Sequence, residues 1–81
     1  MNFHDAVWES IEQVARMNRL TCSGLAKKSG LDATIFNRSK RQSAHGQPRW
    51  TSTETIVKIL HSTNTSALQF AKILQGYLDQ D

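Results

Sequence analysis

The sequence predicts an all-α fold, a bundle of about five short helices in a single domain spanning residues 1–81. Apolar residues recur at helical spacing in several segments, and residues that cap helices precede those segments. No segment alternates convincingly between apolar and polar residues, so no strand is expected. A chain this short buries only about 60% of its unfolded surface, which limits it to a small core between short helices.

The first two helices follow from apolar periodicity and capping. Val7, Ile11 and Val14 form an apolar stripe, which predicts an amphipathic helix over residues 4–17. Thr21 is a good N-cap for a second helix over residues 22–28. Gly30 can adopt the left-handed conformation that ends a helix.

Asp32 is a suitable cap for a third helix, over residues 33–39. Its expected inward positions are Leu31 and Phe36, with Ile35 beside them. Residues 40–50 have no helical period and contain Gly46 and the only proline. They predict a loop that is long for so small a domain.

Two capping boxes predict the last two helices. Thr51 with Glu54 marks the start of a fourth helix, which continues to about residue 62. Ser66 with Gln69 marks the start of a fifth, which continues to about residue 78. Each pair has a hydroxyl residue followed three positions later by Glu or Gln, so each can satisfy two amides that the first turn leaves free.

The positive charge is gathered in the middle of the chain. The net charge is only +3, but residues 16–49 hold eight Lys and Arg against one acid. Residues 1–15 hold three acids and no Lys or Arg, and residues 33–53 contain no acid. This asymmetry is typical of a surface that binds a polyanion such as nucleic acid.

Other classes of function find no support in the residues. His4, His45 and His61 lie on separate elements without paired spacing, so neither a metal nor a cofactor is expected. No serine has a partnered histidine and acid, and no glycine-rich phosphate loop is present, so the chain is not expected to be an enzyme. No apolar run could span a bilayer, so no membrane association is expected. A single cysteine, Cys22, favours a reducing cytoplasm.

Residues 21–38 resemble the helix-turn-helix of the lambda-repressor-like (XRE-type) family of bacterial and phage regulators. The resemblance rests on Leu25-Ala26, Gly30-Leu31 and Phe36. Residues 30–41 and 48–56 are more narrowly similar to the N-terminal domain of phage-type repressors with a LexA-like self-cleaving domain. Because that second domain is absent, the chain is expected to be either a fragment of a longer repressor or a naturally short one. Ser29 departs from the family pattern, which usually has an apolar residue there.

The resemblance implies that the helix over residues 33–39 enters the major groove of duplex DNA. The expected base contacts come from its exposed face: Ala33, Thr34, Asn37 and Arg38. The expected contacts to the DNA backbone come from the start of the second helix and from the basic residues after the third: Thr21, Cys22, Ser23, Ser39, Lys40, Arg41 and Arg49.

These observations lead to a hypothesis of sequence-specific binding to double-stranded DNA and transcriptional regulation, with repression inferred from the resemblance. The alternative is a protein-interaction module, such as an antitoxin or an adaptor, that uses the fifth helix. Phe70, Leu74, Tyr77 and Leu78 on that helix either pack on the first helix or form a homodimer face. Trp50 is expected to pack against the protein rather than to stack on a base.

Overall fold

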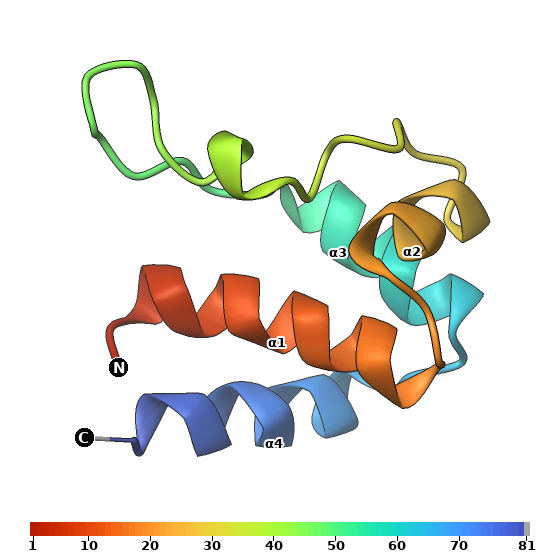
Figure 1. Cartoon of the computed structure of the whole chain (residues 1–81). Coiled ribbons are helices and arrows are strands. Elements are labelled where there is room, and N and C mark those ends of the chain that lie inside the picture. Colours follow the sequence, from red (N-terminus) through yellow and green to blue (C-terminus); the bar gives the residue numbers. More distant parts are fainter. Residues whose placement is uncertain (81) are drawn as a thin grey trace.

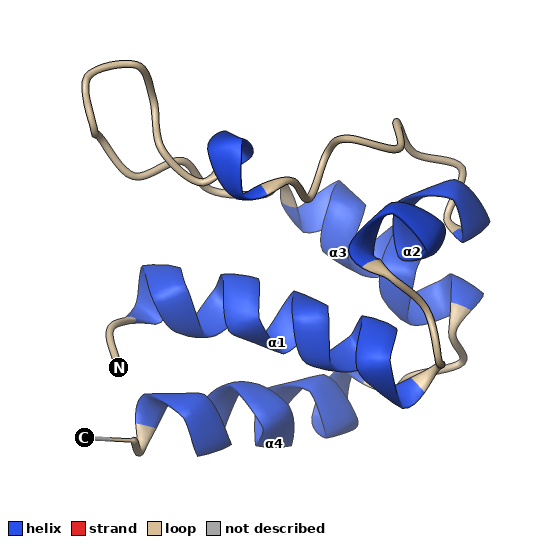
Figure 2. Cartoon of the chain, in the orientation of Figure 1, coloured by secondary structure: helices blue, strands red, loops and turns tan. Residues whose placement is uncertain are grey.

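The computed structural model describes residues 1–80, which form four α-helices and one short 3₁₀ helix (Figures 1 and 2). No β-strand occurs within this range, so the all-α prediction is confirmed, although the number of α-helices is four and not five. The bounds of these elements are α1 (Phe3–Met17), α2 (Cys22–Lys28), η1 (Arg38–Lys40), α3 (Thr53–Ser62) and α4 (Ala67–Leu78).

The first and last helices form one side of the molecule. Helices α1 and α4 run antiparallel, side by side, so the two ends of the chain lie together (Figure 1). The Met1 amino group donates a hydrogen bond to the Gln80 carbonyl. Helix α2 packs against α1, and α3 packs against α2. The segment between α2 and α3 lies on the side of α1 opposite α4 (Figure 1).

Local capping explains where the helices begin. The Thr21 hydroxyl accepts from the Gly24 amide, and Ser66 and Gln69 form a complete capping box, as predicted. The cap of α3 is Ser52, so the prediction of Thr51 is wrong by one residue. Ser52 Oγ accepts from the Thr55 amide and donates to the Thr55 hydroxyl. Because Thr55 is buried, its hydroxyl needs that partner, and this sets the start of α3.

The predicted α-helix over residues 33–39 does not form. Residues 33–36 make a turn, Asn37 is extended with φ −61° and ψ 147°, and η1 follows. The amides of this stretch bond to carbonyls three residues earlier, as in Ile35 to Asp32 and Lys40 to Asn37. The segment is therefore two tight turns joined by one extended residue, and the expectation of a recognition helix here is corrected.

Tertiary contacts explain this departure from the prediction. Phe36 is only 2% exposed in the core, and Arg41 reaches back to Glu12 on α1. If the predicted helix continued as far as Arg41, the two side chains would lie five residues apart and point about 140° apart, so both could not turn inward. The extended Asn37 interrupts the helix and is compatible with the inward position of both side chains.

The core lies where α1, α2, α3 and α4 meet. Phe36 is buried as predicted, Leu25 is buried beside it, and Leu31 is partly buried against them. Ala26 is fully buried. At the end of α2, the Ser29 and Ser62 hydroxyls lie 2.8 Å apart. This hydrogen bond explains why a polar residue is accommodated at position 29.

Gly30 and Gly76 form a matched pair for testing the backbone conformation, because an added Cβ would meet no atom within 4 Å at either site. Gly30 has φ +72°, whereas Gly76 lies inside α4. We expect Gly30→Ala to lower the free energy of unfolding by about 1–2 kcal/mol. Gly76→Ala should raise it by about 0.5–1 kcal/mol. Urea unfolding followed by circular dichroism measures the free energy of unfolding of both variants. Equal changes in the two variants would contradict the left-handed conformation of Gly30.

Candidate nucleic-acid interface

Exposed lysine and arginine side chains gather on α2 and on the segment that follows it. Lys27 and Lys28 lie in the last turn of α2, and Arg38, Lys40 and Arg49 lie between α2 and α3. These elements are on the side of α1 opposite α4 (Figure 1). Five of the eight cations in residues 16–49 are therefore exposed on these elements, and Lys40 and Arg49 border the same hollow.

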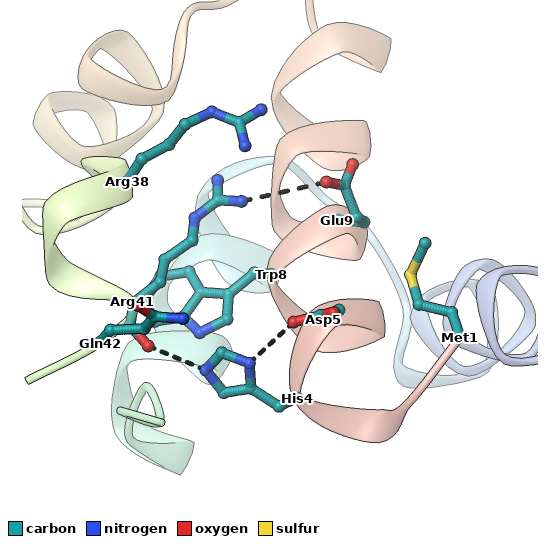
Figure 3. Close-up of a pocket in the computed structure, with 8 residues that line it drawn as sticks. All are labelled: Met1, His4, Asp5, Trp8, Glu9, Arg38, Arg41 and Gln42. Atoms are coloured by element: carbon teal, nitrogen blue, oxygen red, sulfur yellow. Dashed lines mark hydrogen bonds and ion pairs between the residues drawn. The ribbon is translucent and has the colours of Figure 1, made fainter. Parts of the chain in front are cut away.

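Arg41 is an exception among these cations. Its side chain is only 12% exposed, with Nη2 3.2 Å from Glu12 Oε1 and Nη1 3.9 Å from Glu9 Oε1. Its guanidinium carbon lies 5.4 Å from the centre of the Trp8 ring, within range of a cation–π interaction. Figure 3 shows the side chain directed toward α1. The charge of Arg41 is therefore paired inside the protein, and little of the side chain is exposed for the predicted contact with a DNA phosphate.

Residues 41–49 form a loop that closes on itself. The Arg49 amide donates to the Arg41 carbonyl at 2.9 Å, and the Ser43 amide donates to the Gln47 carbonyl at 2.8 Å. Gly46 has φ +77° at the tip. The region predicted as an irregular loop is thus a small hairpin-like loop, and it presents Arg49 beside η1.

Two side chains of α1 hold the base of this loop. His4 Nε2 donates to the carbonyls of Arg41 and Arg49, at 2.9 and 3.0 Å, while His4 Nδ1 lies 2.9 Å from Asp5 Oδ1 (Figure 3). Trp8 Nε1 donates to the Arg49 carbonyl at 3.0 Å. Neither residue is predicted as an anchor from the sequence. The available signal was the spacing of His4, Trp8 and Glu12, which places all three on one stripe of α1.

The four predicted base-contacting residues do not share one helical face. Asn37 and Arg38 are adjacent and exposed, and Arg38 Nη2 lies 3.5 Å from Glu12 Oε1. Ala33 is partly buried. The Thr34 amide and hydroxyl both donate to Asp32 Oδ1, at 2.8 and 2.6 Å. These hydrogen bonds lower the pKa of Asp32 from its ordinary value and engage the hydroxyl that was expected to face DNA.

The residues predicted to contact the DNA backbone fall into an exposed group on η1 and an engaged or partly buried group at the start of α2. Ser39 and Lys40 are exposed on η1, as such contacts require. At the start of α2, the Thr21 hydroxyl is engaged in capping and Ser23 is partly buried. The Cys22 side chain packs against the core. Burial, with a smaller contribution from Glu12, raises the pKa of the Cys22 thiol from its ordinary value.

Trp50 packs against the His4 ring edge to face, with centroids 5.4 Å apart and planes at 83°. The residue is nevertheless 59% exposed. It borders a hollow of about 310 Å³ beside Lys40 and Arg49. The expected packing against the protein is therefore present at His4, and the rest of the indole lies at the rim of this hollow.

Comparison of the chain with models of protein families, with curated proteins and with solved structures gives no match. Among residues 1–80, no group of three or more side chains could hold a metal ion. Within the same range, no helix is both long enough and apolar enough to cross a membrane. The functional interpretation therefore depends on the exposed cations and on the contacts that position them.

The pairing of Arg41 can be tested with a neighbouring cation as control. Arg41→Met keeps much of the apolar stem but leaves Glu9 without its partner and Glu12 with only the exposed Arg38. We expect it to lower the free energy of unfolding by about 2–4 kcal/mol, because removing one member of a largely buried ion pair strands the other. Lys40→Met changes an exposed residue and should stay within about 0.5 kcal/mol of the unsubstituted protein. Chemical denaturation would contradict the assignment if the two variants were equally stable.

Proposed function

We propose that this protein binds double-stranded DNA with sequence preference and regulates transcription by repression, in the manner of lambda-repressor-like regulators. The mechanism is steric, because a protein bound at an operator excludes polymerase. The observation that carries the proposal is the exposure of five cations on elements that lie on the side of α1 opposite α4 (Figure 1): Lys27, Lys28, Arg38, Lys40 and Arg49. Neutralisation of phosphates by such residues supplies most non-specific DNA affinity.

The internal ion pairs make this surface more effective. Glu9 and Glu12 are the acids of α1 nearest to the basic segment, and both pair with the largely buried Arg41. Arg41 therefore offsets one of their two negative charges within the protein, and less negative charge opposes an approaching phosphate. Lys40 and Arg49 have no acid among their neighbours in sequence between residues 33 and 53.

The proposed reading segment consists of tight turns and not of an α-helix. Asn37 and Arg38 are its exposed side chains with the right chemistry, because asparagine can pair with adenine and arginine with guanine through two hydrogen bonds each. Arg38 is 75% exposed, so its contact with Glu12 is easily exchanged for one with a base or phosphate. Helix α2 and the left-handed Gly30 supply the first half of the motif on which the resemblance rests.

The alternative of a protein-interaction module that uses α4 has less support. Two of the residues that suggested it are engaged with the rest of the chain: Phe70 is buried in the core, and Tyr77 bonds to Gln13 and Arg16 of α1. The outward side of α4 retains Leu68 as an exposed large apolar residue. One such residue gives a homodimer face little apolar area.

Selection from a random DNA pool would supply a preferred duplex for fluorescence anisotropy. With about five phosphate contacts, affinity should fall roughly 500-fold between 50 and 200 mM salt. Arg38→Ala and Asn37→Ala should each weaken binding to the selected duplex by about 1–3 kcal/mol. Both should weaken binding to a duplex of scrambled sequence much less. Lys40→Ala should weaken both duplexes alike and make the salt dependence shallower.

Lys72→Ala is the matched control, since Lys72 is exposed on α4, away from the basic side. It should leave affinity and salt dependence unchanged. The proposal fails if Lys72→Ala and Lys40→Ala weaken binding equally, or if affinity does not depend on salt. An Arg38→Ala variant with unaltered sequence preference would overturn the assignment of Arg38 as a base contact.

A further inference from the structure

The hollow beside Trp50 has the composition of a site for a single nucleotide. It measures about 310 Å³, close to the lower end of the range for small-molecule sites. Trp8, Ile35 and Trp50 give it apolar walls, while Lys40 and Arg49 bring positive charge. No aspartate or glutamate lines it. An aromatic surface beside two cations, without an acid, suits a ligand that joins a flat ring to a phosphate.

Trp50 is held in place although it is exposed. Its ring packs against His4, which is itself fixed by contacts to Asp5 and to the Arg41 and Arg49 carbonyls. Trp8, which also lines the hollow, donates to the same Arg49 carbonyl. An immobilised indole loses little conformational freedom when a base stacks on it. Exposure of 59% leaves much of its surface available for that contact.

We propose that this hollow binds an unpaired nucleotide of a single DNA strand, with the base stacked on Trp50 and the phosphate bound by Lys40 and Arg49. Base stacking on aromatic side chains together with cations along the backbone is the general mode of single-strand binding. Paired bases are stacked on their neighbours inside a duplex, so the ligand has to be a strand end or an unpaired position. This ligand differs from the one in the proposed duplex function, although both share Lys40 and Arg49.

Fluorescence anisotropy with labelled oligothymidylate of eight nucleotides tests the inference at low salt. A strand of the same length that lacks bases retains the phosphates and provides the reference ligand. Trp50→Ala should weaken binding of the oligothymidylate by about 5- to 150-fold, the range measured for one stacked base. It should leave binding of the abasic strand within twofold. Trp50→Phe retains an aromatic ring and should show a clearly smaller loss than Trp50→Ala.

Leu68→Ala is the matched control, since it removes an exposed apolar side chain from α4 and should bind both strands normally. Circular dichroism and the free energy of unfolding confirm that each variant is folded. If Trp50→Phe binds oligothymidylate as poorly as Trp50→Ala, stacking is not the interaction and the inference is wrong. It is also overturned if the unsubstituted protein binds both strands equally.

Duplex DNA distinguishes this inference from the proposed function. Trp50→Ala should bind duplex normally, so an equal loss for duplex and single strand would make Trp50 a duplex contact and overturn the nucleotide site. Base-dependent binding of oligothymidylate without binding of any duplex would support the site and reject the proposed function. If the protein binds duplex DNA but binds oligothymidylate and the abasic strand equally, the proposed function is supported and the nucleotide site is rejected.

Discussion

The guanidinium of Arg41 joins the two parts of this molecule that differ most in charge. It lies over Trp8 and between the carboxylates of Glu9 and Glu12, and it is largely excluded from water. The carbonyl of the same residue accepts from His4 and from the Arg49 amide. One residue therefore fixes η1 and the base of the loop on α1. Attraction between opposite charges is stronger here than at the surface, because the surroundings are less polar than water.

The cations of residues 38–49 have two different roles in the structure, although the sequence does not distinguish them. Arg41 is used internally, where it offsets the acids of α1, while Arg38, Lys40 and Arg49 remain at the surface. Salt screens exposed charges much more than buried pairs. The ion pairs of Arg41 with Glu9 and Glu12 should therefore persist at salt concentrations that weaken contacts between the exposed cations and a polyanion. A small domain with a limited apolar core gains order in its longest connection from this polar cluster.

Sequence patterns predict the helices well where the signals are local. The bounds of α2 and the capping box of α4 follow from the residues at the helix ends, and α1 begins only one residue earlier than predicted because Asn2 caps it. The same reasoning fails at residues 33–39. Asp32 does bind the Thr34 amide as a cap would, but burial of Phe36 and Arg41 requires an extended Asn37 between them.

The sequence by itself determines an all-helical class, the core residues Leu25 and Phe36, and a positive charge centred on residues 16–49. These features depend on periodicity, caps and composition, which neighbouring residues express directly. Only the tertiary structure decides which arginine is buried, why Trp50 stays exposed, and that tight turns replace a helix after Asp32. Those outcomes depend on contacts between α1 and residues far along the chain, such as Arg41 and Arg49, which no local pattern in the chain encodes.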